Sequence, residues 1–197
     1  MKRILIILSV LLLGFSYHEP RPVYIYMIGD STMSDKKPEN EPERGWGQML
    51  QDFFNNKVKV SNHARNGRSS KSFLDEGRWQ IVLDSLLPGD YVIIQFGHND
   101  QKNDPARHTD PHSTYKSNLE KYVNETREKG AFPILCTSII RRHFDEKGHL
   151  TDTHGEYPVV TRQVAKEMNV PLLDLQKKTN DIVSDLGPDK SKVLYLH

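Results

Sequence analysis

Cysteine is nearly absent from this sequence of 197 residues, because Cys136 is the only one. A single cysteine excludes an intramolecular disulfide and any zinc site built from cysteines. We expect Cys136 to be a small buried apolar residue near the end of a strand. An excess of one charge is also lacking, with 27 Lys+Arg against 26 Asp+Glu and a formal net charge of +1. No overall field therefore draws the chain to nucleic acid or to a membrane surface.

Long apolar runs are missing too, apart from a short one at the N-terminus. Lys2 and Arg3 precede the apolar residues 4–13, and Gly, Phe and Ser follow at 14–16. Such a run is too short to span a bilayer, which takes about 20 apolar residues, but it fits the apolar region of a secretory signal peptide. We predict a signal peptide over 1–16, one domain over 17–197, and a periplasmic or secreted protein of bacterial type with no membrane contact after cleavage.

Apolar segments typical of buried strands alternate with segments of helical spacing. The clearest strand is 91–96, which is nearly continuous in apolar residues, and the other strand-like segments are 23–28, 57–61, 131–137 and 170–175. Apolar residues recur with helical spacing over 46–54, 79–87, 115–126 and 157–168. This alternation predicts an α/β domain of three α/β/α layers, with a parallel sheet of about five strands covered on both faces.

Three polar turns follow three of the predicted strands. They contain Ser31, Gly67 and Asn99. Because ligands of parallel sheets bind beyond the carboxyl ends of the strands, we expect the three turns to form one site. A serine hydroxyl beside the N–H groups of Ser31 and Gly67 and the side-chain amide of Asn99 suits acyl transfer through an oxyanion. Each turn alone would be interpreted as a helix cap or an ordered loop, so their convergence is what favours a site.

These turns resemble the first three conserved blocks of the SGNH (GDSL-type) hydrolases. The blocks are Gly-Asp-Ser-Thr at 29–32, Asn62-x-Ala64-x-x-Gly67 and Gly-His-Asn-Asp at 97–100. Segments 45–48, 68–73, 76–79 and 95–100 look, more narrowly, like the rhamnogalacturonan acetylesterase branch. The resemblance implies a flavodoxin-like fold, Ser31 as nucleophile, Gly67 and Asn99 in the oxyanion hole, and no cofactor. It also implies removal of acetyl groups from a pectin-type polysaccharide through an acyl-serine.

One block of the family is not found in the sequence. It is an Asp-x-x-His motif near the C-terminus that supplies the general base and the acid that orients it, whereas this sequence ends in Leu-Tyr-Leu-His at 194–197. The nearest imitation, Asp152-Thr153-His154, has the wrong spacing. A serine without a base is a poor nucleophile. We therefore expect a fragment truncated before this block, and the alternative is a short protein that takes its base from His98 or His63.

Basic side chains near the same turns are candidates for substrate binding. Arg65, Arg68, Arg141 and Arg142 suit the carboxylates of a polyuronic chain, because guanidinium binds carboxylate in a bidentate fork, although solvated surface charge is the usual role of arginine. His98 is a further candidate because it belongs to the block of Asn99. The expected partner is thus an acetylated polysaccharide or oligosaccharide.

We predict no metal site and weigh three other functions. Asp104, His108 and His112 are spaced by four, but the prolines at 105 and 111 disfavour the continuous helix that would give this spacing a meaning. A lipase or thioesterase needs an apolar groove, which polar and basic loops disfavour. A phosphate or flavin binder needs a phosphate loop after the first strand, which is lacking. A catalytically inactive carbohydrate-binding relic remains an alternative because of the missing block.

Overall fold

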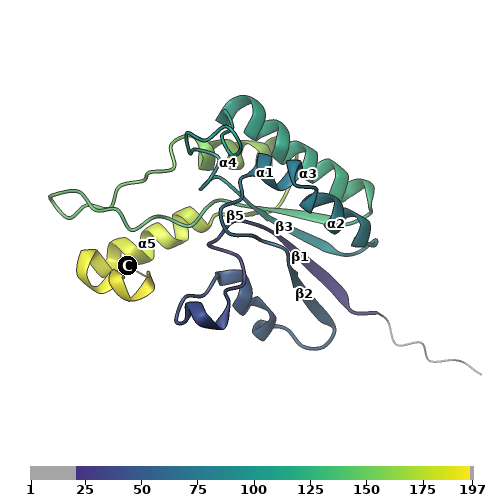
Figure 1. Cartoon of the computed structure of the whole chain (residues 1–197), viewed down its shortest axis with the longest axis horizontal. Coiled ribbons are helices and arrows are strands. Elements are labelled where there is room, and N and C mark those ends of the chain that lie inside the picture. The colour runs from purple at the N-terminus through teal and green to yellow at the C-terminus, as the bar shows by residue number, and fades with distance from the viewer. Residues whose placement is uncertain (1–20, 196–197) are drawn as a thin grey trace, which may run out of the picture.

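The computed structural model describes residues 21–195, so the predicted signal peptide at 1–16 lies outside the described residues. The centre of the domain is a parallel sheet of five strands in the order β2-β1-β3-β4-β5 (Figure 1). The strands are β1 (Val23–Gly29), β2 (Val58–Asn62), β3 (Tyr91–Gln95), β4 (Phe132–Cys136) and β5 (Leu172–Leu173). The predicted α/β class and the parallel sheet of about five strands are confirmed. Cys136, the last residue of β4, is buried as expected.

Four α-helices cover one face of the sheet (Figure 1). They are α1 (Ser70–Asp75), α2 (Arg78–Ser85), α3 (Lys116–Glu128) and α4 (Tyr157–Glu167). Alternate strand residues such as Ile28 and Ile94 point into this layer, as the period of two along a strand requires. Aromatic rings fill it: Tyr122 stacks on Phe96 and meets Trp79 edge-on, with ring centroids 5.6 and 5.1 Å apart. Trp79 is thus part of the buried core.

The other face carries a smaller core. Met27 and Ile93 point into it and pack with Met33, under the 3-10 helix η2 (Trp46–Phe53) and the first residue of α5 (Leu175–Lys190). The helical spacing of the apolar residues over 46–54 predicts one buried helix face, and this is wrong, because Phe53 is 80% exposed and Met49 and Phe54 are exposed as well. A 3-10 helix has three residues per turn, so apolar residues spaced for an α-helix do not gather on one face of it.

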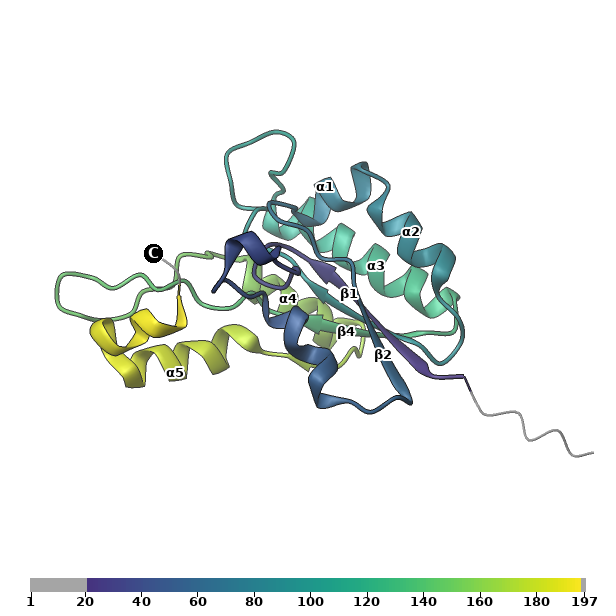
Figure 2. The same ribbon diagram turned by 60° about the horizontal axis from the view of Figure 1, so that its bottom comes forward.

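The remaining elements join the layers. Short helices are η1 (Pro38–Asn40), η3 (Pro111–Tyr115, with π-helical bonding) and η4 (Ser191–Leu194). The fifth strand is shorter than predicted, because Asp174 leaves the sheet and caps α5 by accepting a hydrogen bond from the Lys177 N–H. α5 extends beyond the sheet, and the chain turns back into η4 after it (Figure 2). Within residues 21–195 we find no helix with the length and apolarity needed to cross a membrane.

Candidate active site

The ends of three strands bring the three predicted turns to one edge of the sheet. β1 lies between β2 and β3, with Met27 paired to Asn62 and Gly29 paired to Gln95. The turns after these strands therefore leave the sheet at the same level. The connection from β1 goes to one side and the next crossover goes to the other, so this is the point at which strand order reverses and where ligands bind in such sheets.

The turn that contains Ser31 is held by a chain of side-chain hydrogen bonds. Asp30 is fully buried, and its Oδ1 accepts from the N–H and the hydroxyl of Thr32 at 2.9 and 2.8 Å. Gln95 donates to the Thr32 hydroxyl at 2.6 Å, and the indole N–H of Trp46 donates to Gln95 at 2.7 Å. Because Thr32 is bonded from both sides, the backbone beside Ser31 has a fixed direction.

The predicted oxyanion donors are free to meet a ligand. Among the described residues, no group accepts a hydrogen bond from the backbone N–H of Ser31 or of Gly67. Asn99 is buried, and its side-chain amide donates to the carbonyl of Arg68 at 3.0 Å, which leaves its second N–H available. Gly67 has a φ of +77°, in the left-handed region that glycine adopts without strain.

The loop of Gly67 is fastened to the loop of Ser31. The side-chain oxygen of Asn66 accepts from the hydroxyl of Ser34 at 2.6 Å and from the ammonium of Lys36 at 3.1 Å. Lys36 is itself buried and pairs with Glu43 at 2.8 Å. These contacts fix the distance between the nucleophile turn and the Gly67 turn.

Asp100 organises the turn beneath Asn99. It is fully buried and accepts hydrogen bonds from the N–H of Ser70, the N–H of Gly97 and the hydroxyl of Thr109. Burial raises the pKa of Asp100 to about 6, against these hydrogen bonds, which lower it. Asp100 therefore ties the Asn99 turn to α1 and has a structural role.

A row of three hydrogen-bonded side chains begins at His98, in the turn that contains Asn99. Nδ1 of His98 lies 2.9 Å from Nε2 of His154, and Nδ1 of His154 lies 2.8 Å from Oδ1 of Asp152. Burial lowers the pKa of both imidazoles, that of His98 well below its ordinary value. Asp152 and His154 were missed as site residues, because they lie in an irregular loop. The available signal was the Asp-x-His spacing, which lets Asp152 bond both the backbone and the ring of His154.

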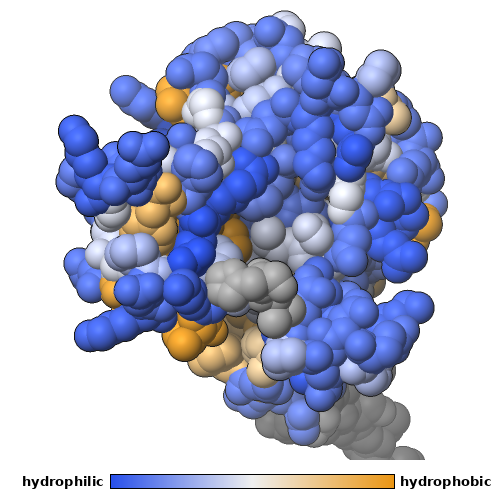
Figure 3. All heavy atoms as spheres, turned by 60° about the vertical axis from the view of Figure 1, so that its left-hand side comes forward, coloured by the Kyte–Doolittle hydropathy of each residue, from blue (hydrophilic) through white to orange (hydrophobic). Residues whose placement is uncertain are grey.

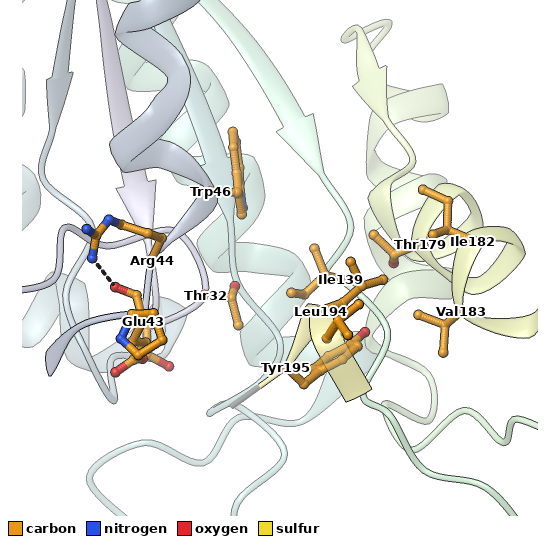
Figure 4. A pocket seen from close by; sticks show the side chains of 13 residues that line it. Thr32, Glu43, Arg44, Trp46, Ile139, Thr179, Ile182, Val183, Leu194 and Tyr195 are labelled. Carbon is orange, nitrogen blue, oxygen red and sulfur yellow. Dashed lines mark hydrogen bonds between the residues drawn. The ribbon is translucent and has the colours of Figure 1, made fainter. Parts of the chain in front are cut away.

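Two adjoining cavities open at this edge, and Figure 4 shows the larger of them. The larger, about 650 Å³, contains Ser31, Thr32 and Trp46 on one side. Its opposite wall is apolar and comes from the loop after β4, from α5 and from η4: Ile139, Ile182, Val183, Val193 and Leu194. The sequence did not predict this wall, because it comes from the part of the chain whose helix was not predicted. The face of the molecule drawn in Figure 3 is mostly hydrophilic, with apolar residues in small areas.

The smaller cavity, about 260 Å³, adjoins the larger at Thr32 and is lined by His98, Arg141 and Arg142. Arg141 donates to the carbonyl oxygens of His98 and Thr153. Arg142 donates to the Ser191 hydroxyl and the Pro188 carbonyl. These two predicted binding residues thus lie beside the site.

The other two predicted binding arginines lie by the Gly67 loop. Arg68 forms an ion pair with Glu76 in which its Nε lies 3.0 Å from each carboxylate oxygen. Arg65 is exposed, and its backbone N–H donates to the carbonyl of Gly29. A role in substrate binding stays a prediction for all four arginines and for His98.

Neither alternative base is bonded to Ser31. Within residues 21–195, no histidine or carboxylate forms a hydrogen bond with the Ser31 hydroxyl. The ring of His63 bonds the hydroxyl of Ser61 at 2.9 Å, and the ring of His98 bonds His154.

Ser31, Gly67 and Asn99 lie in turns at one carboxyl edge of the parallel sheet, an arrangement that agrees with a hydrolase of the SGNH class. The model of the GDSL-like Lipase/Acylhydrolase family matches residues 27–197. The chain belongs to this family, and within it to the rhamnogalacturonan acetylesterase-like branch. It is a serine carboxylic ester hydrolase of the acetylesterase type.

Two relatives from Bacillus subtilis (strain 168) support the assignment to this branch of the family. The chain is 44% identical over 176 residues to rhamnogalacturonan acetylesterase RhgT, covering 89% of this chain and 75% of that protein. It is 40% identical over 168 residues to probable rhamnogalacturonan acetylesterase YesY, covering 85% of this chain and 76% of that protein. The crystal structure of YXIM from Bacillus subtilis matches with a TM-score of 0.80 and 28% identity, covering 89% of this chain and 49% of that one.

Proposed function

We propose that the chain is an exported carbohydrate O-acetylesterase that removes acetyl groups from rhamnogalacturonan, a pectin-type polysaccharide, without a cofactor. The observation that carries the proposal is that Ser31, Gly67 and Asn99 follow strands that end at one edge of the sheet, while the N–H groups of Ser31 and Gly67 and the second amide N–H of Asn99 have no acceptor within residues 21–195. The names of the two relatives from Bacillus subtilis support the choice of substrate.

The reaction follows from these groups. The Ser31 oxygen bonds to the acetyl carbonyl carbon and gives its proton to a general base, while the carbonyl oxygen becomes an anion held by the three donors. The bond to the sugar oxygen then breaks, and that oxygen takes the proton from the base. Water attacks the acetyl-serine in the same way and releases acetate. One such donor is worth about 2.7–4 kcal/mol in the transition state.

The general base of this reaction comes, in our proposal, from outside residues 21–195. Within them His63 and His98 are bonded elsewhere, and the Ser31 hydroxyl has no histidine partner. A direct test compares residues 17–197 with the full-length gene product. Higher activity of a longer product would support the proposal, and equal activity would place the base within 17–197.

The apolar wall opposite Ser31 favours a second candidate, the hydrolysis of longer acyl esters. Ile182, Val183 and Leu194 offer a surface against which an alkyl chain would be buried. The sequence alone disfavours this function, whereas the structure gives it a specific surface.

Rates of hydrolysis on acetylated polymers and on esters of different acyl length decide between the two candidate functions. The full-length gene product is assayed on acetylated rhamnogalacturonan, acetylated xylan and the p-nitrophenyl esters of acetate and octanoate. We expect the fastest acetate release from rhamnogalacturonan, and acetate cleaved faster than octanoate. Preference for octanoate would establish the second candidate, and binding of the polymer without any hydrolysis would indicate the binding relic.

Export is proposed from the character of residues 1–16 and is tested separately. A reporter protein joined behind residues 1–20 should appear outside the bacterial cytoplasm after cleavage of the leader. The same reporter with Leu11→Arg, which puts a charge in the apolar run, should stay inside. Equal export of both would contradict the prediction.

A further inference from the structure

We propose that Asp152 and His154 are positioning residues that hold His98 with Nε2 unprotonated, so that His98 accepts a hydrogen bond from a sugar hydroxyl of the substrate beside Ser31. The sugar in this inference rests on the proposed function. The arrangement of protons does not, because it follows from the hydrogen bonds alone.

The positions of the protons follow from the carboxylate at one end of the row. Hydrogen bonds from His154 hold the pKa of Asp152 below its ordinary value, although burial acts to raise it, so Asp152 is a carboxylate and can only accept. Nδ1 of His154, 2.8 Å from Asp152 Oδ1, must therefore carry a hydrogen. A neutral imidazole carries one hydrogen, which leaves Nε2 of His154 as an acceptor.

The same reasoning passes to His98. Its Nδ1 lies 2.9 Å from the acceptor Nε2 of His154 and must donate to it. Both rings are neutral, because the site is buried and Arg141 lies close to each of them. The remaining nitrogen, Nε2 of His98, consequently has a lone pair and no hydrogen. Among the described residues no group forms a hydrogen bond with it.

The position of His98 in the smaller cavity indicates which kind of ligand group its lone pair binds. The half-buried His98 lines the smaller cavity, which adjoins Ser31 through Thr32. The charged groups of that cavity are the guanidinium groups of Arg141 and Arg142, which only donate. Nε2 of His98 is an acceptor and therefore needs a ligand group that donates. On a polysaccharide this group is a hydroxyl, whose oxygen can also accept from a guanidinium group. A carboxylate of the substrate has no hydrogen to donate to this lone pair.

The arrangement is tested by 15N NMR of the histidine side chains, which needs no activity. We expect the wild-type chain to show His98 protonated at Nδ1 and unprotonated at Nε2. His154→Leu removes the acceptor and should raise the population protonated at Nε2. His154→Gln, whose side-chain oxygen can lie where Nε2 lies, should restore the wild-type form. Asp152→Ala, in a more exposed position, should act like His154→Leu if that variant does not fold.

Asp145→Ala is the matched control, because Asp145 contacts the exposed His149 in the same loop. It should leave the His98 signals unchanged. A wild-type spectrum with Nε2 of His98 protonated, or variants at 152 and 154 that leave the tautomer unchanged, would overturn the inference.

The hydroxyl is tested by binding and by turnover. A deacetylated rhamnogalacturonan oligosaccharide should shift the Nε2 signal of His98 in the wild-type chain and not in His154→Leu. The ratio of kcat/KM on acetylated rhamnogalacturonan to that on p-nitrophenyl acetate should fall about 5–10-fold in His154→Leu and recover in His154→Gln, as loss of one neutral hydrogen bond implies. An Nε2 signal that stays unchanged when the sugar is bound would show that Nε2 of His98 does not accept a hydrogen bond from a sugar hydroxyl. The activity assays use the full-length gene product, and absence of hydrolysis by it would instead count against the proposed function.

Discussion

Asn99 holds the Gly67 loop with one amide hydrogen, and in our proposal the other hydrogen is available to the oxyanion. The first hydrogen bonds the carbonyl of Arg68, so the residue that supplies a donor also fixes the loop that supplies the next one. Asp100 acts one residue further on, where its carboxylate gathers donors from Ser70, Gly97 and Thr109. In our proposal, adjacent residues of one turn thus have different roles: Asn99 donates to the oxyanion and Asp100 supports the turn.

Replacement of Asn99 tests the donor. We expect Asn99→Ala to lower kcat about 10²–10³-fold, because one donor to the oxyanion is lost in a site sheltered from water. The exposed Asn103→Ala is the control and should keep the wild-type rate. Acetate release measured under saturating substrate reports kcat. A less than threefold change in Asn99→Ala would remove Asn99 from the oxyanion hole.

The buried carboxyl of Asp100 makes stability depend on pH. Its pKa is about 6 in the folded chain against an ordinary value of 3.8, so between these values the folded state keeps a proton that the unfolded state has lost. Its contribution is therefore present below about pH 4 and falls as pH rises to about 6, by about 3 kcal/mol in total. Urea unfolding from pH 4 to 7 should show this slope in the wild type and not in Asp100→Asn. An equal slope in both would contradict it.

The elements cover the two faces of the sheet unequally. α1 to α4 bury one face, whereas η2 and the start of α5 cover the other, and the larger cavity lies between these two elements. Trp46 belongs to η2, bonds Gln95 in β3 and lines that cavity. The thinner layer is therefore the one that shapes the space beside Ser31.

Two phenylalanines test this difference between the faces. Phe73 in α1 is fully buried against Phe96, so Phe73→Ala should cost about 3–5 kcal/mol of unfolding free energy. Phe53 in η2 is 80% exposed, so Phe53→Ala should change it by less than about 0.5 kcal/mol. Urea unfolding monitored by circular dichroism measures both. Similar losses in the two variants would mean that η2 is packed as an α-helix face after all.

At the scale of the whole molecule, the sequence predicted the features that depend on local residue patterns, such as the strands and the turns that follow them. The expected placement of Ser31, Gly67 and Asn99 at one edge is seen because each follows a strand, and neighbouring parallel strands end at the same edge. The row from Asp152 to His98 was not found, because its ends are joined only by tertiary structure. The 3-10 geometry of η2 was missed because tertiary contacts, such as that of Trp46 with Gln95, override the helical spacing.

The central claim is that Ser31 forms the acetyl-enzyme, and it is tested most directly by acetate release from acetylated rhamnogalacturonan by the full-length gene product and its Ser31→Ala variant. Ser85→Ala, in the exposed C-terminal end of α2, is the control. The account predicts at least about a thousandfold loss of kcat in Ser31→Ala, with the fold and the control unchanged. Acetate release by Ser31→Ala at a rate near that of the wild type would contradict the account.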